Sequence, residues 1–316
     1  MEKFVIQGGH ILSGDWVPGG NKNEVLPALA ATLLTDQEVI LDNVPRIRDV
    51  EVMVQILADL GAETTWLGEN KLSVRAANIT KTAANVELVK QVRASILFAG
   101  SMLGRLGQVE LPPPGGDVIG RRRLDTHILG LQALGAELDF SDLFRFKTKQ
   151  LVGADIFLDE ASVTATENIL MAAVTARGTT IIRNAACEPH VQGLCRMLTT
   201  MGAQIDGIGT NTLTVVGVKS LWGGEHRIGP DYLEVGSVLG LAAATGGGVR
   251  IKGVRPGELR MILLQFGKLG VQHEFQGNDL WIPGDQTLSI RSDFGHEIPK
   301  IDDAIWPAFP TDLMSI

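Results

Sequence analysis

The chain of 316 residues is poor in cysteine and contains no long apolar stretch. Its two cysteines, Cys187 and Cys195, are eight residues apart on a predicted helix, which is too far for one disulfide bond. No histidine or further cysteine accompanies them at zinc-ligand spacing, so we expect free thiols rather than metal ligands. No run approaches about 18 uninterrupted apolar residues, and the first residues lack the apolar core of a signal peptide. We therefore expect a cytoplasmic protein with no membrane partner.

The chain is also short of positive charge. It has 28 lysine and arginine residues against 36 aspartate and glutamate residues, which gives a net charge of −8. Such a surface repels nucleic acid and anionic membranes, so neither is an expected partner. An anionic ligand must then be held by a local cluster of cations. The composition, 45% hydrophobic and 20% charged, is that of a globular protein, and the length favours two domains.

A repeat is visible in the apolar pattern. An apolar residue followed by glycine recurs with the glycines 74, 67 and 68 residues apart, at Gly61, Gly135, Gly202 and Gly270. Upstream of each glycine, side chains at steps of 3, 4, 7 and 10 predict one buried stripe of an α-helix that ends at the glycine. The four stripes are Val50, Met53, Val54, Leu57 and Leu60; Leu124, His127, Ile128, Leu131 and Leu134; Val191, Leu194, Cys195, Leu198 and Met201; and Leu259, Ile262, Leu263, Phe266 and Leu269.

A second, more apolar helix is predicted upstream in each repeat, and a short strand separates the two helices. The upstream helices are expected at 26–34, 95–103, 168–176 and 236–244, and the strands at 39–41, 109–111, 180–182 and 249–251. Each repeat of about 70 residues is thus an α/β module that cannot bury its apolar faces alone and must pack beside other modules. The predicted fold class is α/β, built from repeated modules.

Two places depart from this period. From strand to glycine the second module has 26 residues, against 22 in the first and 21 in the fourth, and the surplus falls on Pro112–Gly120. Extra residues in a repeat usually form a loop on the functional face. The last residues, Pro310–Ile316, resemble the capped first turn of another apolar helix, so we expect the sequence to be a fragment of a longer protein.

Three short segments carry groups suited to binding anions. Gly19–Asn23 is a glycine-bearing loop with one lysine, but it lacks the spacing of a Walker A motif. Arg121–Arg123 stands at a predicted helix start, where positive charge is unfavourable with the helix dipole and so points to an anionic partner. In Ala161–Glu167, Thr164 and Glu167 are expected to form a capping box, and the free N–H groups of that helix could bind phosphate. Each segment alone is more simply explained as a surface charge or a helix cap.

Together these segments resemble the UDP-N-acetylglucosamine enolpyruvyl transferase family over the whole chain. Related enzymes that make the shikimate-pathway enolpyruvyl ester share the repeat but usually have Lys-Ser where this chain has Lys22-Asn23. Several ordered motifs at the family's separations form a specific signal. They are Lys22-Asn23 before Leu26-Pro27, Val92-Arg93-Ala94-Ser95, Pro114–Gly120, Arg122 with Leu124-Asp125-Thr126-His127, Gly178-Thr179-Thr180, Asn184-Ala185-Ala186 before Glu188-Pro189, and Phe309-Pro310-Thr311-Asp312.

The resemblance implies the two-domain enolpyruvate transferase fold. In that fold each domain is an inside-out α/β barrel of three modules around buried parallel helices. Residues 22–229 would form one complete domain. Residues 1–21 and 230–316 would form part of the second domain, which closes over the substrates, and its remaining modules would be missing from this sequence.

The resemblance also implies a transferase reaction. The enolpyruvyl group of phosphoenolpyruvate would pass to the 3-hydroxyl of UDP-N-acetylglucosamine with release of phosphate, which is the first committed step of peptidoglycan synthesis. Lys22 and Arg122 would supply part of the positive charge for phosphoenolpyruvate, and Asp312 is the expected base for the sugar hydroxyl. Asp117 stands where most family members have a cysteine that protonates C3 and is alkylated by fosfomycin. We expect this aspartate to act as an acid only after domain closure and anionic substrates raise its pKa, and we expect resistance to fosfomycin.

The family's sugar-nucleotide contacts fall on positions spread over several segments, and neither a metal nor a cofactor is implied. Arg123 replaces a usual proline, and Tyr232 and His190 also depart from the family pattern, so we transfer no role to the last two. The expected substrate-binding residues are Lys22, Asn23, Arg93, Arg122, Arg123, Leu124, Asp125, Thr126, Glu160, Ala161, Ser162, Val163 and Asp312.

Two alternatives stay open from the sequence. One is an enolpyruvyl transferase that acts on another acceptor, such as a different UDP-sugar or shikimate 3-phosphate. The other is a non-catalytic paralogue that binds a UDP-sugar. The joint presence of Lys22, Asp117 and Asp312 favours an enzyme, because binding alone needs neither an acid nor a base.

Overall fold

The computed structural model describes residues 3–116 and 123–316, and the chain divides into two compact units. We call Gly20–Gly229 the large unit, and Met1–Gly19 together with Pro230–Ile316 the small unit. Each unit has its own buried apolar cluster, so each is described by itself.

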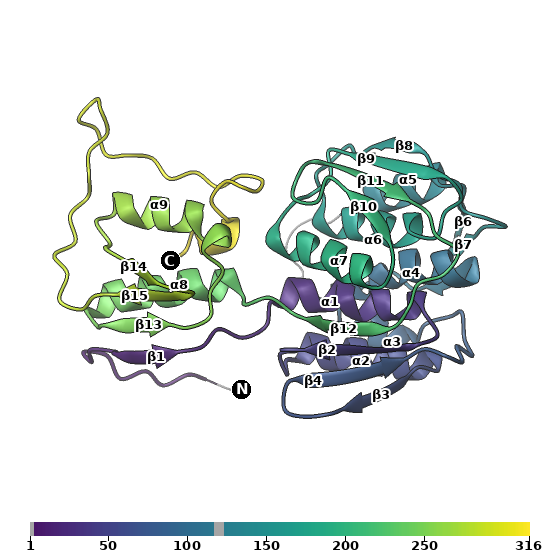
Figure 1. The fold of residues 1–316 in the computed structure, drawn as a ribbon, viewed down its shortest axis with the longest axis horizontal. Coiled ribbons are helices and arrows are strands. Elements are labelled where there is room, and N and C mark those ends of the chain that lie inside the picture. The colour runs from purple at the N-terminus through teal and green to yellow at the C-terminus, as the bar shows by residue number, and fades with distance from the viewer. Residues whose placement is uncertain (1–2, 117–122) are drawn as a thin grey trace. The chain divides into compact units, whose positions relative to one another are not determined.

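Three apolar helices run through the centre of the large unit (Figure 1). They are α1 (Lys22–Ala31), which continues into the short 3₁₀ helix η1 (Thr32–Leu34); α4 (Phe98–Leu106), which follows the 3₁₀ helix η2 (Arg93–Leu97); and α6 (Val163–Ala173). Each of the three contacts the other two. Burial on all sides explains why these segments are apolar around the whole helix rather than along one stripe.

Around each inner helix the module adds a strand, an outer helix and a hairpin. In the first module these are β2 (Glu38–Asp42), α2 (Arg48–Leu60), β3 (Glu63–Trp66) and β4 (Lys71–Arg75), followed by the short α3 (Val86–Val89). In the second they are β5 (Gln108–Leu111), α5 (Asp125–Ala133), β6 (Glu137–Phe140) and β7 (Phe144–Lys147). In the third they are β9 (Thr179–Arg183), α7 (Pro189–Thr200), β10 (Gln204–Asp206) and β11 (Thr212–Val216).

Two further strands complete the sheets of the large unit. β8 (Asp155–Phe157) pairs in parallel with β9, and β12 (Gly224–Arg227) pairs in parallel with β2. The resulting strand orders are β12-β2-β4-β3, β5-β7-β6 and β10-β11-β9-β8. Because β12 ends the large unit and β2 lies near its start, this pairing joins the two ends of the unit, with Gly224 opposite Val39.

The small unit contains one further module of the same kind. Its elements are β1 (Gly14–Trp16), α8 (Tyr232–Thr245), β13 (Val249–Ile251), the 3₁₀ helix η3 (Pro256–Glu258), α9 (Arg260–Lys268), β14 (Glu274–Gln276), β15 (Asp279–Ile282) and the 3₁₀ helix η4 (Thr311–Leu313). The sheet has the order β1-β13-β15-β14, and β1 pairs in parallel with β13. The N-terminal segment thus joins the sheet of a module far along the chain.

The predicted repeat is confirmed in all four modules, with one error. The four glycines that end α2, α5, α7 and α9 have positive φ angles, at +110°, +93°, +102° and +86°. The predicted stripes are buried or half-buried except at Leu269, which is 39% exposed. In the large unit a returning segment donates an N–H to the carbonyl of the residue before the glycine, as Thr80 does to Leu60. In the small unit the returning segment bonds one residue earlier. There the Arg291 N–H donates to the carbonyl of Lys268, and Leu269 stays uncovered.

Among the described residues, no helix has both the length and the apolar character that a membrane crossing requires. Cys187 and Cys195 are both free thiols, as predicted.

Candidate functional site

Lys22 is the first residue of α1, in the large unit. Asn21 caps this helix by accepting an N–H from Glu24 at 3.1 Å, so the glycine-bearing loop ends where the lysine begins the helix. The Lys22 side chain is 48% exposed, and its Nζ lies 3.7 Å from Oδ2 of Asp49 in the first turn of α2. An ion pair this exposed is weak, so the ammonium group remains free to bind an anion. Asn23 follows, half-buried.

Arg93 begins η2, and the described start of the long loop lies directly against it. The Gly116 N–H donates to the carbonyl of Lys90 at 3.1 Å, with φ at +88°. A Cβ at Gly116 would stand 2.9 Å from the Arg93 backbone nitrogen, so only glycine permits this approach. Two predicted catalytic residues of the loop, Asp117 and Arg122, lie outside the described residues.

Beyond the loop, Arg123 is fixed by two carboxylates. Its Nε lies 3.1 Å from Oδ2 of Asp125, and a terminal nitrogen lies 3.2 Å from Oδ2 of Asp159. The hydrogen bond that Arg123 donates to Asp125, with the charges of both aspartates, raises the pKa of Arg123. Thr126 donates its hydroxyl to Oδ1 of Asp159 at 2.7 Å. Asp159 was not among the predicted site residues, although it connects this segment to the start of α6.

The start of α6 differs from the sequence prediction. The helix begins at Val163, and its N-cap is Ser162, whose Oγ accepts an N–H from Ala165 at 3.4 Å. The predicted capping box of Thr164 and Glu167 is therefore wrong, because Thr164 lies inside the first turn and Glu167 lies in the buried core. Ser162 satisfies the N–H groups of Ala165 and Thr166. Within the described part of the chain, the N–H groups of Val163 and Thr164 have no such acceptor, so this end of α6 is suited to an anion.

His127, on α5, contacts the start of α6, and it was predicted in an apolar stripe and in a family motif, with no role in the site. It is buried, with Nδ1 3.0 Å from Nδ2 of Asn168 and Nε2 3.2 Å from Oγ1 of Thr164. Burial, together with the positive charge of Arg93, lowers the pKa of His127 to about 3. The ring is therefore neutral near pH 7. A titratable residue within an apolar stripe was the sequence signal for this cluster, together with an asparagine in the apolar helix.

These contacts bring several predicted residues together in the large unit. Asp159 links Arg123 and Thr126 to the segment Glu160–Val163. His127 hydrogen-bonds to Thr164 at the start of α6, and the positive charge of Arg93 acts on the His127 ring. Ala161 lies within that segment, and Leu124 packs against the apolar core. Lys22 and Asn23 begin α1, which packs against both η2 and α6. Asp312 belongs to the small unit, where it lies in η4 with an exposed side chain.

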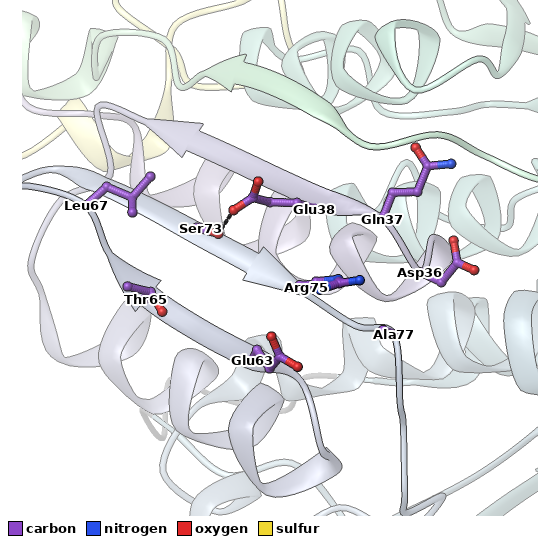
Figure 2. A pocket seen from close by; sticks show the side chains of 9 residues that line it. All are labelled: Asp36, Gln37, Glu38, Glu63, Thr65, Leu67, Ser73, Arg75 and Ala77. Carbon is purple, nitrogen blue, oxygen red and sulfur yellow. Dashed lines mark hydrogen bonds between the residues drawn. The ribbon is translucent and has the colours of Figure 1, made fainter.

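A separate pocket of about 750 Å³ lies on the outer face of the sheet formed by β2, β4 and β3 (Figure 2). Its wall carries the carboxylates of Asp36, Glu38 and Glu63 beside Arg75, and Ser73 donates to Glu38 at 2.6 Å. None of the predicted site residues lines it. Among the described residues, no group of three histidine, cysteine, aspartate or glutamate side chains is placed to hold a metal ion. The predicted residues of the large unit that the structure describes therefore lie at or near helix starts and not in this pocket.

The chain matches known proteins over almost its full length. Residues 6–316 match the family model described as EPSP synthase (3-phosphoshikimate 1-carboxyvinyltransferase). A UDP-N-acetylglucosamine 1-carboxyvinyltransferase of Bradyrhizobium diazoefficiens is 52% identical over 99% of this chain and 73% of its own. One of Treponema denticola, with the same name, is 51% identical over 100% of this chain and 74% of its own.

A solved structure shares the fold. The crystal structure of an enolpyruvyl transferase from Streptomyces tendae superposes with a TM-score of 0.76 over 88% of this chain and 67% of its own, at 19% identity. The repeated α/β modules are thus those of an enolpyruvyl transferase fold, as predicted. On the family match over residues 6–316 and on relatives about half identical, this chain belongs to the EPSP synthase (3-phosphoshikimate 1-carboxyvinyltransferase) family.

Proposed function

We propose that this chain is a cytoplasmic UDP-N-acetylglucosamine 1-carboxyvinyltransferase of peptidoglycan synthesis. It transfers the enolpyruvyl group of phosphoenolpyruvate to the 3-hydroxyl of UDP-N-acetylglucosamine and releases phosphate. The observation that carries this proposal is the shared name of relatives 52% and 51% identical over nearly the whole chain. Two free thiols fit a reducing compartment.

The reaction needs an acid, a base and a set of cations. The sugar hydroxyl attacks C2 of phosphoenolpyruvate while C3 gains a proton, which gives a tetrahedral phospho-ketal. Loss of phosphate and of one C3 proton then forms the enolpyruvyl ether. We assign the acid to Asp117 and the base to Asp312, while Lys22 and Arg122 stabilise the negative charges of phosphoenolpyruvate.

The UDP-sugar is assigned to the cluster of the large unit at the starts of η2 and α6. Arg93 and Arg123 supply positive charge there, and Val163 and Thr164 supply N–H groups at the positive end of a helix dipole. In this proposal Arg123 exchanges one of its two aspartate partners for the nucleotide. Asn23, Leu124, Asp125, Thr126 and the segment Glu160–Ser162 border the same ligand.

A phosphate-release assay with phosphoenolpyruvate tests the proposal. UDP-N-acetylglucosamine should support release, whereas shikimate 3-phosphate and other UDP-sugars should not. Release with shikimate 3-phosphate alone would replace the proposed acceptor, and UDP-sugar binding without any release would leave a binding protein.

Replacement of the proposed acid sharpens the same test. Asp117→Asn should lower turnover by at least about 100-fold, the contribution typical of a general acid, while the dissociation constant for UDP-N-acetylglucosamine stays within about twofold. Asp117→Glu, which keeps a carboxyl group, is the matched control and should retain more activity. The wild-type enzyme should show no time-dependent inactivation by fosfomycin, whereas Asp117→Cys should acquire it. Undiminished turnover by Asp117→Asn would refute the assigned role.

A further inference from the structure

A chain of hydrogen bonds leads from the core of the large unit to the start of α6. It begins at Asn168 in the middle of that helix, passes through the buried ring of His127 on α5, and ends at Thr164 in the first turn of α6. Asn168 and His127 are both buried, and Thr164 is half-buried. Thr164, the last residue of this hydrogen-bond chain, is thus the one closest to solvent.

The backbone of α4 and η2 fixes the direction of the Asn168 amide. Its Oδ1 accepts the N–H of Gly100 at 2.5 Å, and its Nδ2 donates to the carbonyl of Ile96 at 3.0 Å. The reversed amide would place two donors together and two acceptors together, so only one orientation satisfies both backbone groups. Nδ2 therefore faces the His127 ring as a donor.

That donor selects one tautomer of His127. Because Nδ2 of Asn168 donates to Nδ1 at 3.0 Å, Nδ1 must carry a lone pair. The low pKa of the ring keeps it neutral, so its single proton is on Nε2. Nε2 then donates to Oγ1 of Thr164 at 3.2 Å.

Thr164 must consequently give its own proton to another acceptor. Thr166, one half-turn further along the helix, donates its hydroxyl to the carbonyl of Ser162 at 2.8 Å. Within the residues that the structure describes, Thr164 has no comparable carbonyl or carboxylate acceptor. Its hydroxyl therefore stands as a donor beside the N–H groups of Val163 and Thr164 itself.

We propose that the Thr164 hydroxyl donates a hydrogen bond to a diphosphate oxygen of the UDP-sugar, and that Asn168 and His127 are positioning residues that keep it a donor. This assignment rests on the proposed function and adds a residue that contacts the nucleotide. The sequence prediction gave the Thr164 side chain only a structural role in a capping box and expected the N–H groups of that helix start to bind a phosphate. The chain of hydrogen bonds makes the Thr164 hydroxyl selective for an anion, because an anion accepts its proton whereas a cationic or donor group cannot.

The first test compares Thr164→Val with the wild-type enzyme. A hydrogen bond to a charged group contributes about tenfold or more in affinity, so Thr164→Val should raise the dissociation constant and the KM for UDP-N-acetylglucosamine about tenfold, with a much smaller change in kcat and in the KM for phosphoenolpyruvate. Thr164→Ser should rescue the loss. The matched control is Thr175→Val, whose hydroxyl donates to the carbonyl of Gly104 beyond the opposite end of α6.

The second test reverses the tautomer. Asn168→Asp keeps the shape but replaces the donor by an acceptor, which moves the His127 proton to Nδ1 and makes Nε2 compete for the Thr164 proton. It should lose the same affinity as Thr164→Val, and the double variant should lose no more than either single variant. ¹⁵N NMR of the histidines in the folded wild-type enzyme should show His127 protonated at Nε2 throughout pH 6 to 8.

The outcomes separate this proposal from the proposed function. Unchanged UDP-sugar affinity in Thr164→Val, or a wild-type His127 protonated at Nδ1, would overturn the role of Thr164 while leaving the enzymatic function standing. A wild-type enzyme that neither binds UDP-N-acetylglucosamine nor releases phosphate with it would overturn both.

Discussion

The two units contain the same module but bury its inner helix to different degrees. In the large unit every residue from Glu24 to Ala31 of α1 is buried, and so is every residue from Ala165 to Ala173 of α6. In the small unit α8 is equally apolar in sequence, yet Leu241 on it is 47% exposed. The difference lies in the neighbours, because α1, α4 and α6 pack against one another whereas α8 packs against the strands β13 and β15 and the short η4. An inner helix is thus buried by neighbouring modules, and its apolar sequence alone does not bury it.

The units differ also in their buried polar groups. Within the described part of the chain, Gln265 is the one polar residue of the small unit that is buried as a whole, and the other buried polar residues lie in the large unit. They include Glu24, His127, Glu167 and His190. Burial shifts the pKa values of the last three away from their usual range. The large unit should therefore carry most of the pH dependence of stability.

The largest effect is expected from matched leucine replacements on the inner helices. Leu29→Ala, in α1 where the side chain is fully buried, should lower the free energy of unfolding of the large unit by about 2–5 kcal/mol. Leu241→Ala, in α8, should lower that of the small unit by about 0.5 kcal/mol or less. Urea unfolding with deuterium pulse labelling of peptides would assign each transition to a unit.

An equal loss in both variants would contradict the comparison, because it would mean that α8 is as fully enclosed in solution as α1. Leu264→Ala, on the exposed side of α9, serves as a second surface control in the small unit.

The next effect concerns Glu167 and rising pH. Burial, reinforced by the negative charges of Glu188 and Glu24, raises the pKa of Glu167 well above 4.5, and its Oε1 has no hydrogen-bond partner. The folded state then holds a proton that the unfolded state releases. Its contribution to stability is complete below pH 4.5 and is lost as pH rises toward the folded pKa, at about 1.4 kcal/mol per pH unit. Glu167→Gln should remove this slope in the large unit above pH 4.5.

The measurement is the urea midpoint of each unit at pH 6, 7 and 8. The small unit should show the same profile in the variant and in the wild-type protein. A large unit whose stability is independent of pH in the wild-type protein would show that Glu167 is ionised in the folded state.

The sequence predicted the modules better than it predicted the site. Helical phase and glycine spacing identify an inner helix, a strand and an outer helix in every module, because these features depend on neighbours within one segment. Leu269 was placed wrongly because its exposure depends on where a distant segment returns. The capping box failed for a similar reason, since Thr164 bonds across to α5 and not along its own helix.

The site residues were reached through resemblance, and the structure adds what resemblance could not supply. Asp159 links two predicted segments through one side chain, and His127 on α5 joins Asn168 and Thr164 of α6. Neither contact follows from spacing, because each depends on how α4, α5 and α6 pack together. Asp117 and Arg122 lie outside the described residues, so their roles stay predictions.

The smallest effect is expected from His190 in mild acid. Burial lowers the pKa of this residue, in α7, to about 4 from a usual value of 6.5. The unfolded state takes up a proton below pH 6.5 that the folded state refuses, so stability present above pH 6.5 is lost as pH falls toward 4, at about 1.4 kcal/mol per pH unit. His190→Gln should remove about 1 kcal/mol of the acid loss of the large unit between pH 6.5 and pH 5.5, and His127 should keep the remaining loss of similar size. The urea midpoints of the large unit at these two pH values measure the change. If His190→Gln leaves the acid loss of the large unit unchanged, His190 is solvated in the native state and does not contribute to the acid sensitivity of the large unit.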